Sequence, residues 1–515
     1  MAHLGSRRRL ALAVPVVLSL TASLGFLPAT AAAAPAVEVA PGAEVAASAG
    51  ETMSYVVNTR TDRRTLASVK KEIARAGGSI LTSYDRIGVI VAHSADPSFG
   101  ATMRAVRGVE SAGATRTVPF TPVATTQVDA MERLDAEEIA RITEASAEAG
   151  LGEPLEAEQW DLRAIGADKA ARIDPGSPDV TVAVIDTGVD DLHPDLAPSF
   201  SPSQSADCST GVADASEGAW RPVDLDHDHG THVAGEIAAA RNGIGVAGVA
   251  PGVKVSGITV AQPDENQLFF TEAIVCAFVF AADKGVEITN NSYYTDPWEF
   301  NCPDDDDQRA LLDAVTRAKR YAESKGTLHV ASAGNSYLDL DSDAIVDDGS
   351  PNDGTPITRT IDPHVCLDMP AQLDGVVTVS STGYFDKKSY FSNYGKGVID
   401  VAAPGGDARQ LPPDTPSGNG RILSTLPGGG YGWSQGTSMA APHAAAVAAL
   451  IKSHHPKATP GALAAMLKAQ ATKFPCPSTY DYNDDGVQDA VCVGGPRGNG
   501  FYGAGIVDAL KAVTK

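Results

Sequence analysis

The feature that most constrains the fold of this chain is a short apolar run that ends in an acidic turn. Residues 182–190 read VAVIDTGVD, so four apolar, mostly β-branched residues precede Asp186. A run of this kind predicts a parallel strand that is buried on both faces. Asp186 then lies at the carboxyl end of the strand, where open α/β sheets collect their active sites. Considered alone, the same Asp could equally cap a turn.

A second segment places a histidine at the start of a predicted helix. Residues 227–235 read HDHGTHVAG and lead into small and apolar residues, which suit a helix packed closely against a sheet. His229 lies at the helix start, facing the strand ends, where an imidazole can act as a general base. His227 and His232 are close enough in sequence to be the base instead. For His232, one turn further along, a buried structural role is the better interpretation.

A third segment places a serine in a similar position. Residues 436–443 read GTSMAAPH and precede a long apolar stretch, which predicts a tight turn and then a buried helix. Pro442 suits an early helical position, because its missing N–H costs least there. Ser438 then lies at the positive end of the helix dipole. On its own, Thr437 or Ser438 could simply cap the helix.

An Asp, a His and a Ser in these settings supply the parts of a nucleophilic hydrolase: a hydroxyl, a base that removes its proton, and a carboxylate that orients the base. The oxyanion formed by attack also needs preorganised donors. Residues 328–336 read LHVASAGNS, an apolar run that ends in small residues and Asn335. We predict that the Asn335 amide and the backbone N–H of Ser438 are these donors. A turn Asn after a strand is the alternative.

In order and in sequence, these segments resemble the motifs of the subtilisin-like family of serine endopeptidases, the subtilases. The resemblance implies an α/β fold with helices flanking a parallel sheet, and it assigns residues 155–515 to the peptidase domain. It also implies that Asp186, His229 and Ser438 form the catalytic triad, with Asn335 in the oxyanion hole. Polypeptide substrates would be cleaved through an acyl-enzyme, without a cofactor for catalysis.

One segment departs from the family pattern. Subtilases usually have a Ser-Leu-Gly strand that pairs with the substrate backbone, and the matching residues here are Ser292, Tyr293 and Tyr294. We expect the two rings to narrow the first specificity pocket or to block one end of the cleft, unless they pack beneath the loop that follows. The resemblance further implies that Ser332 and Gly334 line the substrate-binding cleft.

The N-terminus predicts export. Three arginines at 7–9 precede an apolar stretch and an alanine-rich exit, which is the order of a secretory signal peptide. We assign residues 1–34 to the signal peptide and 35–52 to a linker. An uncleaved membrane anchor is the alternative, which the alanine-rich exit disfavours. The protein is therefore expected to be secreted and extracellular, as a monomer with no membrane contact after cleavage.

Residues 53–120 predict a separate small α+β domain, because strand and helix patterns alternate there in the order βαββαβ. This ferredoxin-like order resembles the inhibitory prodomain that precedes many subtilases, which assists folding and then blocks the cleft until it is removed. A ferredoxin-like appendage without this role is the alternative. Residues 121–154, rich in Ala and Glu, are predicted to be an acidic linker that contains the maturation site.

Charge and cysteine content limit the possible binding partners and the cellular compartment. The chain has 40 Lys and Arg against 64 Asp and Glu, a net charge of -24, so no basic stripe is available and we exclude nucleic-acid binding. Six cysteines agree with an oxidising destination. Cys476 with Cys492 is the best local pair, and the other pairs are guessed as Cys208 with Cys276 and Cys302 with Cys366.

Two acidic stretches are candidate binding sites. Residues 481–489 read DYNDDGVQD, which matches the spacing of a calcium loop with Gly486 at its sharp turn. Cys492 stands in the twelfth position in place of the closing Glu, so a solvated turn is the alternative. Residues 304–307 are four aspartates, for which a solvated loop is favoured over a subsite for basic residues. The predicted ligands of a structural calcium are Asp481, Asn483, Asp485, Val487 and Asp489.

The sequence as a whole predicts a secreted serine endopeptidase made as a self-processing zymogen. A narrow-specificity peptidase that processes precursors is the second hypothesis, suggested by the two tyrosines at 293 and 294. A catalytically silent subtilase scaffold that acts as a binding protein is the third. The presence of all four catalytic residue types argues against this last possibility.

Overall fold

The computed structural model describes residues 52–119, 131–264, 266–483 and 485–515 of the chain. These residues belong to one compact unit that spans 45–515. The predicted signal peptide lies outside the described residues, as does the 35–52 linker apart from its last residue. Within the described ranges, no helix is long and apolar enough to cross a membrane.

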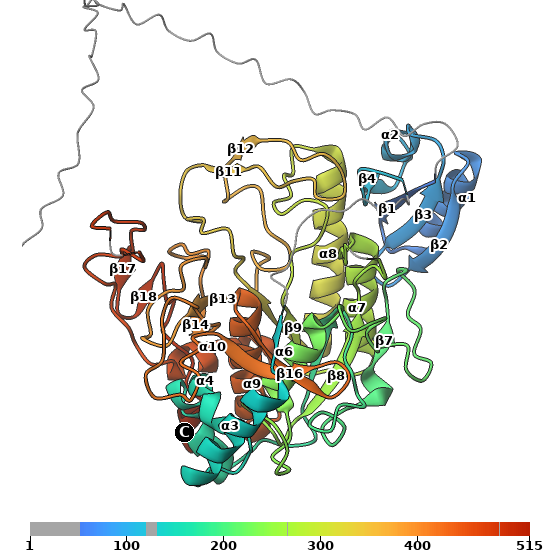
Figure 1. Ribbon diagram of the computed structural model, residues 1–515. Coiled ribbons are helices and arrows are strands. Elements are labelled where there is room, and N and C mark those ends of the chain that lie inside the picture. Colours follow the sequence, from blue (N-terminus) through green and yellow to red (C-terminus); the bar gives the residue numbers. More distant parts are fainter. Residues whose placement is uncertain (1–51, 120–130, 265, 484) are drawn as a thin grey trace, which may run out of the picture. The chain divides into compact units, whose positions relative to one another are not determined.

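A seven-stranded sheet is the framework of the fold (Figure 1), and all of its neighbouring strands pair in parallel. The apolar run predicted as a strand is β6, which ends at Asp186. The predicted fold class is therefore confirmed. The order across the sheet is β14 (Val401–Pro404), β13 (Val377–Thr382), β10 (Leu328–Ser332), β9 (Ile288–Asn291), β6 (Thr181–Asp186), β8 (Lys254–Thr259) and β7 (Ala206–Asp207).

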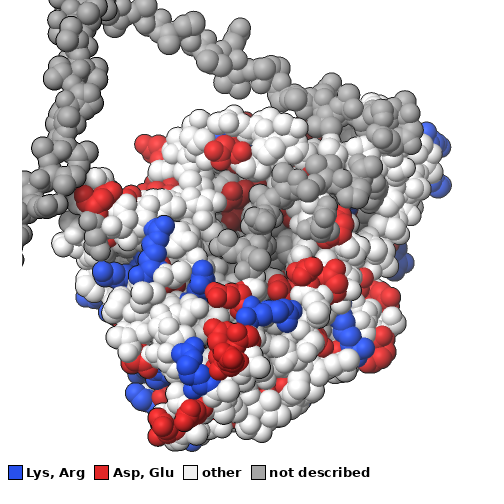
Figure 2. All heavy atoms as spheres, viewed as in Figure 1, with Lys and Arg blue, Asp and Glu red and all other residues white. Residues whose placement is uncertain are grey.

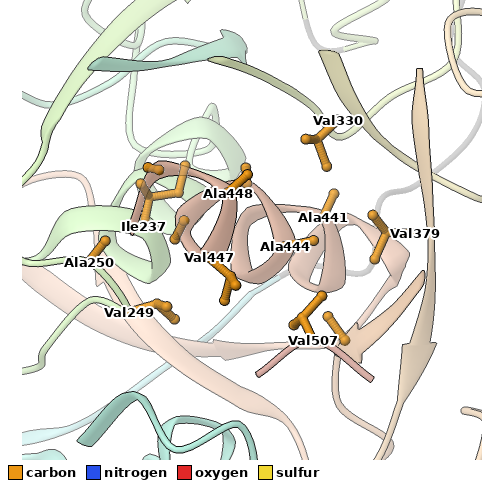
Figure 3. Packing of buried hydrophobic residues seen from close by; sticks show 14 of the residues in the cluster. Ile237, Val249, Ala250, Val330, Val379, Ala441, Ala444, Val447, Ala448 and Val507 are labelled. Atoms are coloured by element: carbon orange, nitrogen blue, oxygen red, sulfur yellow. The ribbon is translucent and has the colours of Figure 1, made fainter. Parts of the chain in front are cut away.

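Helices cover both faces of this sheet, because successive residues of each strand point in opposite directions. Val182 and Val184 of β6 belong to one buried apolar cluster, whereas Ala183 and Ile185 belong to another. Figure 3 shows the first cluster around the alanine-rich α9, whose side chains meet valines of β10 and β13. The helices of this face are α6 (His229–Ala238), α9 (Thr437–His454), α10 (Pro460–Gln470) and α11 (Ala509–Thr514), and those of the other face are α7 (Thr271–Asp283) and α8 (Asp306–Lys325).

Residues 53–114 form a four-stranded antiparallel sheet with the expected element order βαββαβ. Tyr55 and Val57 of the central strand pack under the helices of this segment, while Val56 packs with residues of α7 and α8. The open face of the small sheet therefore contacts the helices α7 and α8 of the large sheet. The elements are β1 (Met53–Thr59), α1 (Arg63–Arg75), β2 (Ser79–Tyr84), β3 (Val89–Ser94), α2 (Phe99–Arg104) and β4 (Val109–Ala114).

The four aspartates at 304–307, expected to form a solvated loop, lie at the start of α8. Asp305 caps the helix by accepting hydrogen bonds from the backbone N–H groups of Asp307 and Gln308. Asp306 and Asp307 also pair with Arg104 at the end of α2, at 3.3 Å and 3.0 Å. The acidic run thus joins α8 to the N-terminal segment.

The stretch expected to be an acidic linker is partly folded onto β16 (Gly430–Ser434) and its surroundings. β5 (Glu132–Arg133) pairs with β16, and α3 (Ala136–Glu148) begins with a capping box. Ile142 of α3 is buried with Trp433, so one narrow apolar stripe is sufficient to dock this helix. Residues 120–130, in which part of the predicted linker falls, lie outside the described residues.

Three disulfides join the six cysteines in the expected pairs: Cys208–Cys276, Cys302–Cys366 and Cys476–Cys492. On the face seen in Figure 2, small groups of acidic and basic side chains are intermixed. The remaining elements are short: η1 (Glu156–Glu158), α4 (Trp160–Ala164), α5 (Ala167–Ile173), η2 (Pro202–Gln204), β11 (Ile345–Asp347), β12 (Arg359–Ile361), β15 (Ile422–Leu426), β17 (Gly494–Gly495) and β18 (Gly498–Asn499).

Candidate active site

Asp186 and His229 form a buried pair at the carboxyl edge of the sheet. Asp186 ends β6, His229 begins α6, and His229 Nδ1 lies 2.8 Å and 3.0 Å from the two carboxylate oxygens. Thr187 braces both, since its N–H donates to Asp186 and its hydroxyl accepts the N–H of Gly230. The carboxylate therefore fixes the tautomer in which Nδ1 carries the proton and Nε2 is free to accept one.

The environment of His229 sets its basicity. Burial alone would lower the pKa of this imidazole, but the charge and hydrogen bond of Asp186 raise the pKa above its usual value of 6.5. A base with a raised pKa removes a proton more readily once it is neutral, and Asp186 stabilises the imidazolium that results.

The two alternative histidines have other partners. His232 is fully buried, with Nδ1 2.8 Å from Glu236 and Nε2 3.1 Å from the carbonyl oxygen of Gly432. His227 lies 2.7 Å from Asp224 through Nδ1. Neither ring contacts Asp186, so the geometry favours His229 as the base.

Ser438 lies in the first turn of α9, next to the strand end that follows β9. Its hydroxyl donates to the carbonyl oxygen of Ser292 at 3.3 Å, and the Ser292 hydroxyl donates to the carbonyl oxygen of Ser438 at 2.8 Å. α6 and α9 pack together, so His229 and Ser438 begin neighbouring helices at the same edge of the sheet. A hydrogen bond between such a pair commonly tightens only when substrate is bound.

Two candidate oxyanion donors converge beside Gly436. The Asn335 side-chain oxygen accepts hydrogen bonds from the N–H and hydroxyl of Thr437, which leaves its NH2 group as a donor. A Cβ at Gly436 would lie 3.5 Å from the backbone nitrogen of Ser438 and 3.6 Å from Asn335 Nδ2. Only a residue without a side chain leaves this space open for an oxyanion.

A buried charge network, not foreseen from the sequence, connects α6 to α9. His443 of α9 is fully buried, with Nε2 3.0 Å from Asp161 and Nδ1 shared between the carbonyl oxygen of Met439 at 2.7 Å and Glu236 of α6 at 3.2 Å. Burial opposes the charge, but the two carboxylates prevail and raise the pKa of His443 to about 10. His443 is thus an imidazolium that holds the two helices in register.

The two tyrosines of the substrate strand do not act together. Tyr293 is 7% exposed, stacks on Phe269 and donates its hydroxyl to Asn291 at 3.0 Å, so its ring points into the core. Tyr294 points to the other side, where its hydroxyl accepts a hydrogen bond from Asn352 at 2.9 Å. Tyr293 is therefore part of the apolar cluster beneath the sheet, together with residues of α7 and α8.

The residues that follow β10 contact the start of α9. Ser332 is buried at the strand end, and the N–H of Gly334 donates to the hydroxyl of Thr437 at 3.1 Å. Gly334 has a φ of 93°, and a Cβ there would lie 2.5 Å from Asn393 Nδ2. A glycine is therefore required just before Asn335, both for the backbone conformation and for the close packing.

The loop predicted to bind calcium turns sharply at Gly486. Gly486 has a φ of 84°, and both oxygens of Asp481 accept N–H groups inside the loop, from Asp485 at 3.2 Å and Gly486 at 2.7 Å. Asp489 accepts the N–H of Tyr482 at 2.9 Å, which turns it toward the same loop. Among the described residues, which exclude position 484, no three carboxylate, His or Cys groups converge as a metal site.

Comparison with known proteins gives a family match. The profile of the subtilase family matches residues 177–505, more than half of the chain. Fervidolysin from Fervidobacterium pennivorans is 30% identical over 350 residues, which cover 65% of this chain and 42% of fervidolysin. A thermophilic serine proteinase from Bacillus sp. (strain AK1) is 33% identical over 287 residues, covering 56% of this chain and 55% of that protein. The chain thus spans about half the length of these curated relatives.

A solved structure matches the whole fold. The epidermin leader peptide processing serine protease from Staphylococcus aureus superposes with a TM-score of 0.63, covering 90% of this chain and 98% of that one. Sequence identity in the superposition is 23%, so this likeness concerns the fold.

Proposed function

Because the chain belongs to the subtilase family of serine peptidases, we propose that it is a secreted serine endopeptidase with Asp186, His229 and Ser438 as its catalytic triad. The observation that carries the proposal is the buried His229–Asp186 pair, at 2.8 Å, on the same edge of the sheet as Ser438. A catalytically silent scaffold would have no need to keep this pair and the two oxyanion donors in place.

The reaction follows from the geometry. His229 Nε2 removes the proton of Ser438 as the hydroxyl oxygen attacks the scissile carbonyl carbon, and Asp186 stabilises the imidazolium. The oxyanion enters the space beside Gly436, where Asn335 Nδ2 and the Ser438 N–H donate to it. His229 then returns the proton to the departing amine. A water molecule, deprotonated by His229, hydrolyses the ester of Ser438 and restores the enzyme.

The test of this proposal is the Ser438→Ala variant. Loss of the nucleophile should lower turnover by roughly a million-fold. Labelling with a fluorophosphonate probe, read by mass spectrometry, should modify Ser438 in the wild type and nothing in the variant. Retained peptidase activity in the variant would show that another residue is the nucleophile.

We also propose that residues 53–120 act as an inhibitory prodomain. Its last described residues run toward the cleft: Arg116 pairs with Glu272 at 2.7 Å, with both side chains buried, and the N–H of Thr117 donates to Asp353 at 2.6 Å. Asp353 is the neighbour of Asn352, which binds the Tyr294 hydroxyl at the cleft. The segment thus ends beside the substrate strand.

Maturation should occur on the N-terminal side of residue 131, because β5 and α3 are integral to the peptidase domain. Intact mass of the secreted protein should show loss of about the first 120 to 130 residues in wild type, the stretch between the N-terminal segment and β5. If the enzyme processes itself, Ser438→Ala should lose only its signal peptide. Identical maturation of both forms would mean that a second protease makes the cut.

We propose that residues 481–489 bind one calcium ion with a structural role. The left-handed Gly486 and the inward-facing Asp481 support this proposal. Asn483, Asp485, Asp489 and the carbonyl oxygen of Val487 would complete the ligands, and the Cys476–Cys492 disulfide closes the segment. The ion would supply charge neutralisation to this acidic loop, far from the proposed chemistry.

A further inference from the structure

Three chain segments meet beside the candidate catalytic serine. The strand end 292–295 hydrogen bonds Ser438, and residues 332–336 carry Asn335. The third segment, 367–369, contacts the first, because the N–H of Thr295 donates to the carbonyl oxygen of Met369 at 2.7 Å. Asp368 Oδ2 lies 3.9 Å from the position that a Cβ of Gly334 would occupy, so the acidic residue of the third segment also lies close to the second.

Asp368 lacks a compensating charge. Its side chain is 3% exposed, and its Oδ1 is buried without a hydrogen-bond partner among the described residues. Burial and the nearby Glu299 raise the pKa of this carboxyl well above its usual value. Burial therefore disfavours the charged form of Asp368 until a positive charge is placed beside it.

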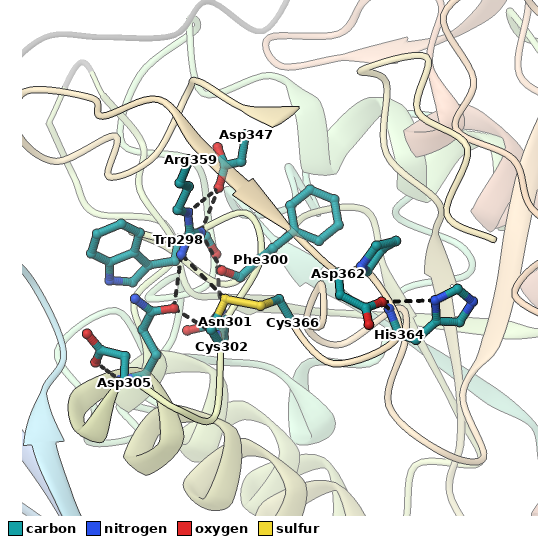
Figure 4. The surroundings of a disulfide bond; sticks show 12 residues. Trp298, Phe300, Asn301, Cys302, Asp305, Asp347, Arg359, Asp362, His364 and Cys366 are labelled. Atoms are coloured by element: carbon teal, nitrogen blue, oxygen red, sulfur yellow. Dashed lines mark hydrogen bonds and ion pairs between the residues drawn. A yellow bond between two sulfur atoms is a disulfide. The ribbon is translucent and has the colours of Figure 1, made fainter. Parts of the chain in front are cut away.

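Glu299 adds a second carboxyl close enough to Asp368 to raise its pKa. Its Oε1 accepts the hydroxyl of Ser336, the neighbour of Asn335, at 3.1 Å. Burial and the charge of Asp347 raise the pKa of Glu299 to about 7, against the opposing charge of Arg359. Figure 4 shows that Arg359 itself pairs with Asp347 at 2.6 Å and lies over the ring of Trp298. Arg359 is therefore engaged mainly by Asp347.

The segment 367–369 is held rigidly. Asn301 and Leu367 exchange two backbone hydrogen bonds of 2.9 Å, and the Cys302–Cys366 disulfide staples the same two segments (Figure 4). Asp368 follows directly after this anchor. A pocket that is shaped before substrate arrives binds a matching side chain at a lower entropic cost.

We propose that these three segments form a pocket, with Asp368 on its floor, that selects polypeptide substrates with a lysine or arginine side chain at the residue whose carbonyl is attacked. The inference rests on the proposed function and names its substrate class. A guanidinium or ammonium group inserted between the segments supplies the donors and the positive charge that Asp368 lacks. Arginine offers its donors in a planar fork that matches a carboxylate.

The first experiment uses the mature wild-type enzyme and a tetrapeptide p-nitroanilide series that differs only in the last residue. Arginine is compared with its neutral isostere citrulline, lysine with norleucine, and phenylalanine is added. We expect kcat/KM to be roughly 30- to 1,000-fold higher for each cationic residue than for its neutral analogue, the range for losing one partner of a buried charge pair. Equal rates on arginine and citrulline, or a preference for phenylalanine, would overturn the inference.

The second experiment compares Asp368→Asn with Asp362→Asn, a matched control in the same loop. Asp362 is an exposed carboxylate that pairs with His364 (Figure 4). With rates normalised to fluorophosphonate-labelled enzyme, Asp368→Asn should lose roughly 30-fold or more on arginine and stay within a few-fold on citrulline. The control should match the wild type. A uniform loss on all peptides would mean that Asp368 only supports the fold.

The outcomes distinguish a failure of the proposed function from a failure of the acidic-pocket inference. An enzyme that labels with fluorophosphonate and cleaves the phenylalanine peptide best keeps its proposed function and loses the acidic-pocket inference. A wild type that neither labels nor cleaves any member of the series loses both. Mapping the cleavage sites in denatured casein gives an independent reading, in which cuts should follow lysine and arginine.

Discussion

At the scale of single residues, the His229–Asp186 pair makes a prediction about pH. Catalysis needs neutral His229, and its raised pKa places the acid limb of kcat/KM above pH 6.5. Asp186→Asn removes the main interaction that raises this pKa, so the limb should move to lower pH. Turnover should also fall by roughly ten-thousand-fold.

The measurement is the pH profile of kcat/KM for both enzymes. Asp224→Asn serves as the control, because Asp224 is the partner of His227, the alternative base. An unchanged profile in that variant agrees with His229 as the base. A shift in the Asp224 variant instead of the Asp186 variant would transfer the role to His227.

His443 makes a second prediction about pH, this time for stability. Its folded-state pKa of about 10 exceeds the usual 6.5, so folding favours the protonated form. Its contribution is complete below pH 6.5 and is lost as pH rises toward 10, by up to about 1.4 kcal/mol per pH unit. His443→Gln should be less stable at pH 6.5 and should lose less stability on going to pH 9.5.

Thermal unfolding in the Ser438→Ala background, which prevents self-digestion, measures this effect. The melting temperatures of the two variants should approach each other as the pH is raised. Parallel curves would mean that His443 carries no charge in the folded protein.

At the scale of elements, α8 is the platform on which the N-terminal segment rests. Arg317 Nη1 donates to the carbonyl oxygen of Thr59 at 2.8 Å, and to two further carbonyl oxygens at 3.3 Å, while its Nη2 pairs with Glu110. Arg317→Ala removes the hydrogen bonds that α8 donates to these carbonyl oxygens. The cleaved segment should then dissociate sooner, and the lag before activity appears should shorten several-fold.

Arg320, an exposed arginine on the same helix, provides the control. Arg320→Ala should keep the wild-type lag, followed with a peptide substrate after secretion. If both variants behave alike, the contacts of α8 do not govern release. If Arg317→Ala lengthens the lag, the segment acts on folding and not as an inhibitor.

At the scale of the whole molecule, the calcium proposal predicts a dependence of stability on metal. An ion that binds only the folded protein stabilises it by about 2.7 kcal/mol at a hundred times its dissociation constant. Adding EDTA should therefore lower the melting temperature of Ser438→Ala, and calcium should restore it. Asp481→Asn should abolish the response, whereas Asp214→Asn, at an exposed carboxylate elsewhere, should keep it. A metal response that survives Asp481→Asn would place the ion at another site.

How much could be predicted from the sequence depended on how local each feature is. The strand that ends at Asp186 and the helix that begins at His229 are written in short patterns, and both have the predicted positions. The direction of Tyr293 could not be predicted, because it depends on which residues after β9 face α7. Asp368 carried no signal at all, since its importance arises where residues 301 and 367, distant in sequence, pair.

The helix in the supposed linker illustrates the same limit. Its apolar stripe is too thin to predict burial from composition, and only the surface that receives Ile142 makes it part of the domain.

The Cys302–Cys366 disulfide anchors the proposed specificity pocket independently of the proposed catalytic residues. The residues proposed for bond breaking come from β6, α6 and α9, which the packed sheet holds, whereas the floor of the pocket is a disulfide-bound loop outside it. Replacing one side chain of that loop should therefore change the substrate preference and leave the proposed catalytic residues in place. Diversification of targets in such a scaffold needs neither a new fold nor a new catalyst.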